Sequence, residues 1–240
     1  MLLRPCTIVL LVLASLRVNA ASVTGVIIAS EAARSQAVNV AAMDQIQTRN
    51  RSGLTDLRSM EGAQNQTEET RRGLEESLTS YRELAKKEPE IYLPQVAATL
   101  NDLGILDSNQ NRIENARKEF EQALKIYREL ARKEADIYLR YVAITLNNLG
   151  ILEGAQNYLE EALRIYRQLA QKEREIYLPY VATTLNNLGM LDSNKNRLNE
   201  ARKEYAEALK MYRELAQKEP ETYLPSVPMT LNNLGLLDNA

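Results

Sequence analysis

The sequence of 240 residues contains no histidine, no tryptophan and a single cysteine, Cys6. Histidine is the commonest general base and the commonest metal ligand, so its absence removes the usual centre of both kinds of site. One cysteine excludes an intramolecular disulfide and any zinc site built from several thiolates. The sequence also has no nucleophile–base arrangement, no glycine-rich phosphate loop and no metal-ligand spacing. We therefore expect no enzymatic activity, metal, cofactor or small-molecule substrate.

The sequence also lacks an excess of positive charge. It has 30 Lys and Arg against 32 Asp and Glu, which gives a formal net charge of −2. A nucleic-acid ligand needs a basic field to hold its phosphates, so we expect no nucleic-acid partner. With 45% hydrophobic residues, the chain is too apolar for wholesale disorder and has the composition of a folded protein.

The first 20 residues have the order of regions that is typical of a secretory signal peptide. Arg4 precedes the apolar run 7–16, and the small-residue ending Val18-Asn19-Ala20 follows. This run is well short of the ~20 residues that a membrane span needs. We expect cleavage near Ala20 and a secreted or periplasmic protein. The alternatives are an uncleaved membrane anchor and a cytoplasmic protein with a chance apolar start.

Two motifs return in step along the rest of the chain. The first is LNDLGIL at Leu100, which recurs as LNNLGIL at Leu146, LNNLGML at Leu185 and LNNLGLL at Leu231. The second is YRELAKKEPEIYLP at Tyr81, with close copies at Tyr127, Tyr166 and Tyr212. The glycines of the first motif are 46, 39 and 46 residues apart. Repetition with a period of about 20–50 residues is the signature of a solenoid.

Each repeat predicts two helices. The first motif places Leu100, Leu103 and Gly104 on one face of a helix. A turn is expected at residues 107–111, because Asp, Ser and Asn are frequent there. A second amphipathic helix is expected over about residues 112–133.

These residues resemble the tetratricopeptide-repeat signature in type and spacing. Leu103-Gly104, Ala116 and Phe120 take the places of its Leu-Gly pair, its alanine and its later aromatic residue. Asp107 stands where a second aromatic is usual, and the period exceeds the usual value of about 34 residues. The repeat therefore looks most like kinesin-light-chain-type repeats and related bacterial arrays. The resemblance implies an all-α fold, a right-handed α-solenoid of antiparallel helix pairs.

The repeats predict the following organisation. Residues 1–20 are the signal peptide, 21–49 are unassigned, and 50–240 form the solenoid. Its units are about 50–91 (degenerate), 92–137, 138–176, 177–222, and a half unit, 223–240. The unit 138–176 lacks seven residues after Asn157, which we expect to shorten its second helix by about 10 Å.

In tetratricopeptide arrays the first helices line a concave groove, and a helical wheel identifies the residues that would face it. They are Asn101, Asp102, Ile105, Ile144, Asn147, Asn148, Ile151, Asn186, Asn187, Met190, Asn232 and Asn233. Asparagine both donates and accepts hydrogen bonds, so this row could pair with the main chain of an extended peptide. In kinesin-light-chain-type repeats, groove asparagines have this role. The alternative is a structural role, in which they cap or tie neighbouring helices.

The sequence thus predicts a non-catalytic scaffold that binds a protein or extended peptide in the groove. The predicted groove contains no Lys or Arg, which argues against a clamp for carboxylates. The alternative is a self-assembling structural protein. It would associate as a homo-oligomer through an uncapped C-terminal helix with the apolar stripe Leu231, Leu234 and Leu237.

Overall fold

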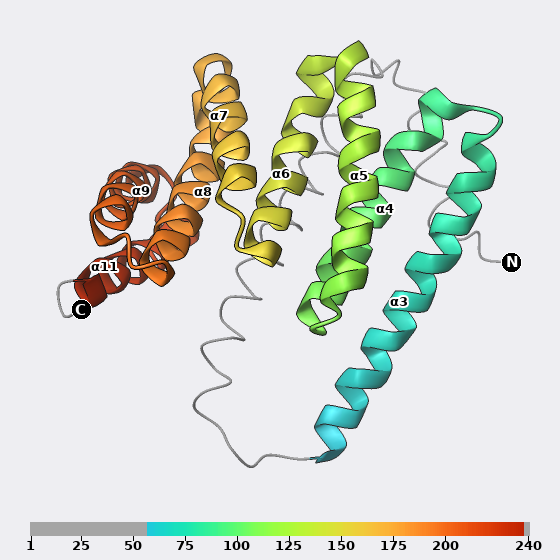
Figure 1. Ribbon diagram of the computed structural model, residues 1–240, viewed down its shortest axis with the longest axis horizontal. Coiled ribbons are helices and arrows are strands. Elements are labelled where there is room, and N and C mark those ends of the chain that lie inside the picture. The colour runs from blue at the N-terminus through green and yellow to red at the C-terminus, as the bar shows by residue number, and fades with distance from the viewer. Residues whose placement is uncertain (1–56, 238–240) are drawn as a thin grey trace, which may run out of the picture. The chain divides into compact units, whose positions relative to one another are not determined.

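The computed structural model describes residues 57–237, and the compact unit that holds the repeats begins at Ala63. The predicted signal peptide, the unassigned segment 21–49 and the start of the first unit lie outside the described residues and stay predictions. Every element of the described range is an α-helix, and consecutive helices from α4 onward pack against one another (Figure 1). The prediction of an all-α solenoid is confirmed.

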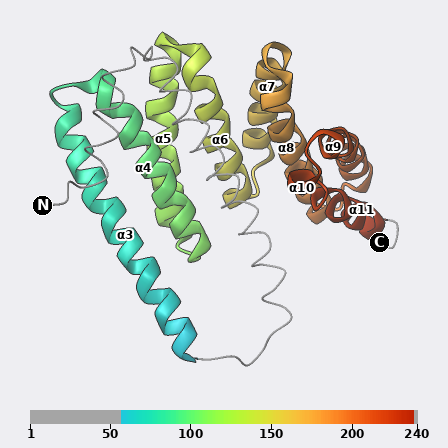
Figure 2. The ribbon, with the colours of Figure 1, turned by 180° about the vertical axis from the view of Figure 1, so that it is seen from behind.

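The helices alternate between two roles, seen from both sides in Figures 1 and 2. We call the first helix of each repeat an A helix and the second a B helix. The A helices are α4 (Pro89–Asn109), α6 (Ala135–Glu153), α8 (Arg174–Asn194) and α11 (Ser226–Leu237), the last preceded by the single turn α10 (Pro220–Tyr223). The B helices are α3 (Leu57–Ala85), α5 (Ile113–Lys133), α7 (Gln156–Lys172) and α9 (Leu198–Lys218).

A glutamate with non-helical backbone angles precedes each A helix. It is the one residue between the two helices at three junctions, and at the first junction Lys86 and Lys87 come before it. Glu134 is both the C-cap of α5 and the N-cap of α6, with φ −134° and ψ 70°. Glu88, Glu173 and Glu219 have nearly the same backbone angles at the other three junctions. Proline follows directly at Pro89 and Pro220, where a missing N–H costs no intrahelical hydrogen bond. The YRELA–KEPE–YLP motif therefore specifies a sharp reversal of the chain.

The motif around the repeat glycine packs α4, α6 and α8 closely onto the B helix that follows each of them. A Cβ atom placed on Gly104 would lie 2.7 Å from the Phe120 ring. The same atom on Gly150 would lie 2.6 Å from Leu159. Any larger residue would force the helices apart, so these glycines are required for the packing distance.

The missing seven residues of the third unit are divided between two helices and the turn. α7 has 17 residues whereas α5 and α9 have 21, so it is shorter by about one turn, or 6 Å. The other three residues are lost from the end of α6 and from the turn, where Gly154 has a φ of 59°. The expected loss of 10 Å from the second helix is therefore wrong: left-handed Gly154 makes a tighter turn possible.

The predicted first unit differs from the others in its described part. α3 runs without interruption from Leu57 to Ala85, through the place where a helix pair would need its turn. Only a B helix of this unit is therefore present among the described residues. Arg58 stands where the later units have their close-packing glycine.

Candidate binding surface on the A helices

Three rows of side chains cross the A helices on one face, which we call the A-helix face. Residues at spacings of three and four lie on the same side of a helix. The rows are Ile91, Ile137 and Ile176; Ala98, Ile144, Thr183 and Met229; and Ile105, Ile151, Met190 and Leu236. All of these side chains are half-buried or exposed, and most are apolar. The face therefore offers an apolar surface that is continued from one repeat to the next.

Hydrogen-bonded asparagines run between the second and third rows, and we call them the amide ladder. Asn148 Nδ2 donates to Asn101 Oδ1 at 3.3 Å. The pattern recurs in the following repeats: Asn187 Nδ2 donates to Asn147 Oδ1 at 3.1 Å, and Asn233 Nδ2 donates to Asn186 Oδ1 at 3.4 Å. In each pair, the first amide of one A helix accepts from the second amide of the next. The ladder thus ties successive repeats together.

The structure divides the predicted groove residues by exposure. Asn101, Asn147, Asn148, Asn186 and Asn187 are buried; Ile105, Ile144, Met190 and Asn233 are half-buried; and Asp102, Ile151 and Asn232 are exposed. The buried amides have the tying role that was the alternative for this row. Much of the surface open to a ligand belongs instead to the apolar residues beside them.

One basic side chain lies on this face, where the sequence predicted none. The guanidinium carbon of Arg140, on α6, lies 4.6 Å from the centre of the Tyr141 ring. Arg140 Nη2 donates to the Tyr141 hydroxyl at 2.9 Å. An alignment of the repeats shows that Arg140 is exceptional, because the other A helices have Pro94, Pro179 and Pro225 at this position. The helical wheel of a single repeat missed it because Arg140 precedes the LNNLG motif.

Tyrosines surround this arginine. Tyr141 stacks on Tyr127, and Tyr180 stacks on Tyr166, each with ring centres 5.1 Å apart. Burial raises the pKa of Tyr177 and of Tyr180, while the charge of Arg140 lowers both. These phenols are therefore neutral at physiological pH, and Arg140 is a cation among aromatic rings.

A second polar feature lies where A helices end. Asp107, on α4, is fully buried and pairs with Arg71 of α3 and with Arg112 at 3.6 Å. Asp192 has the same place on α8 and pairs with Arg197. Arg71 has no counterpart there. Arg71 lies ten residues before Tyr81 of its B helix, and the residue ten before Tyr166 on α7 is Gln156.

The side-chain contacts of Gln156 agree with its equivalence to Arg71. Arg71 Nε contacts Glu75 at 3.0 Å, four residues later, and Gln156 Nε2 likewise donates to Glu160 at 2.7 Å. Without a second cation, burial and then Asp192 raise the pKa of Glu204 to about 8. Burial also raises the pKa of Glu119, the matching residue beside Asp107, but there Arg71 opposes the rise.

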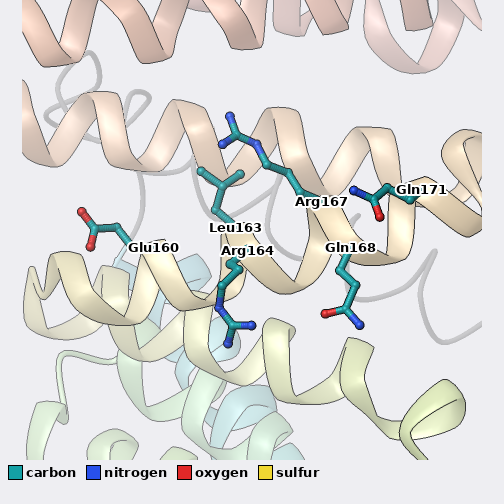
Figure 3. A pocket seen from close by; sticks show the side chains of 6 residues that line it. All are labelled: Glu160, Leu163, Arg164, Arg167, Gln168 and Gln171. Atoms are coloured by element: carbon teal, nitrogen blue, oxygen red, sulfur yellow. The ribbon is translucent and has the colours of Figure 1, made fainter.

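The hollow drawn in Figure 3 lies along α7. Its lining residues, Glu160, Leu163, Arg164, Arg167, Gln168 and Gln171, all come from this one helix. Arg164 and Arg167 point away from each other (Figure 3). Within residues 57–237, no group of acidic residues is arranged to hold a metal ion, and no helix is long and apolar enough to cross a membrane.

Comparison with known proteins agrees with the repeat assignment. Family models described as tetratricopeptide repeat match residues 96–131 and 141–214, which confirms the resemblance to this family. No curated protein matches the chain. A crystal structure titled BtubC (BKLC) from P. vanneervenii matches with 24% identity and a TM-score of 0.49, over 71% of this chain and 65% of that chain. This chain thus spans less than two thirds of the length of that relative. The narrower likeness to kinesin-light-chain-type repeats stays a prediction.

Proposed function

We propose that this chain, whose residues 96–131 and 141–214 are tetratricopeptide repeats, is a non-catalytic scaffold that binds an extended protein segment across the A-helix face. Tetratricopeptide repeats generally serve protein–protein interaction. The observation that supports this face is its three rows of half-buried and exposed side chains. An apolar surface that continues over several helices is typical of a protein-binding site.

The amide ladder has a supporting part in this proposal. Its buried amides hold neighbouring A helices at a fixed spacing, so the apolar rows are positioned before any ligand arrives. Preorganisation of this kind lowers the entropic cost of binding. The half-buried Asn233 and the exposed Asn232 and Asp102 are the polar groups best placed to contact a ligand main chain.

A random dodecapeptide library displayed on phage tests the proposal. The wild type should enrich a family of peptides, and a double variant, Ile151→Glu with Met190→Glu, should bind them at least tenfold more weakly. Two charges introduced into the apolar rows must be desolvated by any segment that covers them. Thermal melting checks that the variant is folded.

The matched control is Gln168→Glu with Gln171→Glu. It adds the same two charges to exposed positions on α7 and should bind like the wild type. If no peptide is enriched, or if both double variants bind equally well, the A-helix face is not the binding surface.

A self-assembling structural protein remains a second candidate, favoured by the exposed side of α11. Leu231 is 42% exposed and Leu236 is 61% exposed. A Cβ atom placed on Gly235 would have no neighbour within 4 Å, whereas Tyr205 fills this place over Gly189. Of the predicted stripe, however, Leu237 is buried against Ala201 and Tyr205. Association would therefore use Leu231 and the half-buried Leu234, because Leu236 lies on the A-helix face.

We also propose that the protein acts outside the cytoplasm, in the secreted or periplasmic space, because of the signal-like order of residues 1–20. N-terminal sequencing of the protein recovered from its native host tests this. A mature N-terminus near Ala21 is expected, and an intact Met1 would contradict it.

A further inference from the structure

We propose that Arg140 makes the A-helix face selective for an acidic segment, by pairing with an Asp or Glu side chain of the bound peptide between α6 and α8. This inference rests on the proposed function. It adds the chemical class of the ligand and the place in the array at which that ligand is held.

The first support is that Arg140 has no acidic partner among the described residues. It contacts the Tyr141 ring and hydroxyl, at 4.6 Å and 2.9 Å, and the Tyr177 hydroxyl. Its Nε atom is buried without a hydrogen-bond acceptor. A half-buried guanidinium with only neutral partners keeps most of its attraction for an anion.

The second support is its surroundings. Ile137 and Ile144 lie on the same side of α6, one turn before and one turn after Arg140, and both are half-buried or exposed. Ile176 continues the first row on the neighbouring helix α8 and is 53% exposed. A carboxylate that reaches Arg140 would thus be flanked by apolar contacts, where the local dielectric is low and a charge pair is stronger.

The third support is that this position differs from its copies. The other described A helices have Pro94, Pro179 and Pro225 here, so among them only α6 offers a cation at this position. A single anchor also sets the register of an extended segment, because the apolar rows alone look similar when shifted by one repeat. The expected ligand therefore has one acidic residue with apolar residues on both sides.

Peptide selection tests this inference. Random dodecapeptides are displayed as fusions through their C-termini, so that only side chains can supply the carboxylate. The wild type should enrich peptides with a shared Asp or Glu, and Arg140→Gln should enrich peptides without it. Arg140→Lys keeps the charge and should retain the acidic preference. Arg164→Gln removes an exposed cation from α7 (Figure 3) and should select the same peptides as the wild type.

A fluorescence titration then measures the pairing directly. For a selected peptide, changing its acidic residue to the matching amide should weaken binding to the wild type about tenfold or more. The same change should have no effect on binding to Arg140→Gln. Equal losses with both proteins would place the carboxylate elsewhere and overturn the inference.

The outcomes also separate this inference from the proposed function. Enriched peptides without a shared acidic residue would support binding to the A-helix face but reject the role of Arg140. No enriched peptide at all would reject both. If Arg140→Gln melts far below the wild type, the Arg140→Lys variant and the peptide amide change still decide the result.

Discussion

The asparagine side chains of the A helices differ in burial, although they belong to copies of one motif. Asn187 is buried and donates to Asn147, while Asn232, at the first-amide position of α11, is exposed. The same motif therefore has a buried member between repeats and an exposed one at the end of the described array.

We predict that Asn187→Ala lowers the free energy of unfolding by about 1–2 kcal/mol, because it leaves the buried Asn147 oxygen without that donor. Asn232→Ala is the control and should change stability by less than about 0.5 kcal/mol, as exposed substitutions do. Urea unfolding measures both. Equal effects would mean that the amide ladder does not stabilise the stacking of repeats.

Glu204 links the shortened unit to the pH dependence of stability. Its pKa in the folded protein is about 8, against an ordinary value of 4.5. Between these two values the folded state keeps a proton that the unfolded state has released. Stability therefore falls as pH rises from about 5 to about 8, because the unfolded state binds fewer protons.

We predict that Gln156→Arg flattens this dependence. The substitution restores the cation that Arg71 supplies beside Asp107, and a cation near Glu204 lowers its pKa. Urea unfolding at pH 5 and pH 8.5 should show a smaller loss of stability in the variant than in the wild type. Gln168→Arg, which adds the same charge at an exposed place on α7, should leave the loss unchanged; a flattened curve there too would indicate a general charge effect.

At the scale of the helix, the repeat glycines differ in what lies over them. Gly189 of α8 is covered by the B helix α9, whereas no described B helix follows α11, which carries Gly235. The ring of Tyr205 lies 2.8 Å from where a Cβ atom on Gly189 would be, and nothing lies within 4 Å of the same atom on Gly235. An identical substitution should therefore have opposite effects at the two positions.

We predict that Gly189→Ala destabilises the protein by about 1–3 kcal/mol, the usual cost of overpacking. Gly235→Ala should be neutral or stabilising by up to about 1 kcal/mol, because alanine is the better helix former. Thermal and urea unfolding of the two variants provide the comparison. A loss at Gly235 as large as that at Gly189 would show that a covering side chain lies over α11 in solution.

Helix α7 shows that a repeat can lose a turn and keep its packing. Leu159 takes the place over Gly150 that Phe120 has over Gly104. The sequence reveals a loss of seven residues but not its division, since both a shorter helix and a tighter turn fit the same alignment.

At the scale of the whole molecule, successive repeats are joined by recurring contacts. Arg128 of α5 contacts Glu161 of α7, and Arg167 of α7 contacts Glu207 of α9, at 2.9 and 2.7 Å. These pairs are exposed and each contributes little to stability. The stacking depends mainly on the buried leucines and the amide ladder, as in other arrays where each repeat contacts only its neighbours.

For the second candidate function we predict concentration-dependent light scattering. If α11 mediates self-association through Leu231, the apparent mass should rise with concentration, and Leu231→Glu should return it to that of a monomer. An apparent mass that stays monomeric over the whole range for the wild type would reject self-assembly through this face.

The sequence by itself determined the repeat, its two helices and the packing glycines, because these depend on local periodicity and on a motif copied three times. Only the tertiary structure decided which side chains are buried between repeats. The asparagines look open on the wheel of one helix, but the next A helix covers them and takes up their hydrogen bonds. Arg140 became visible for the same reason: its tyrosine partners Tyr177 and Tyr180 lie on α8, and only the stacking of repeats brings them to α6.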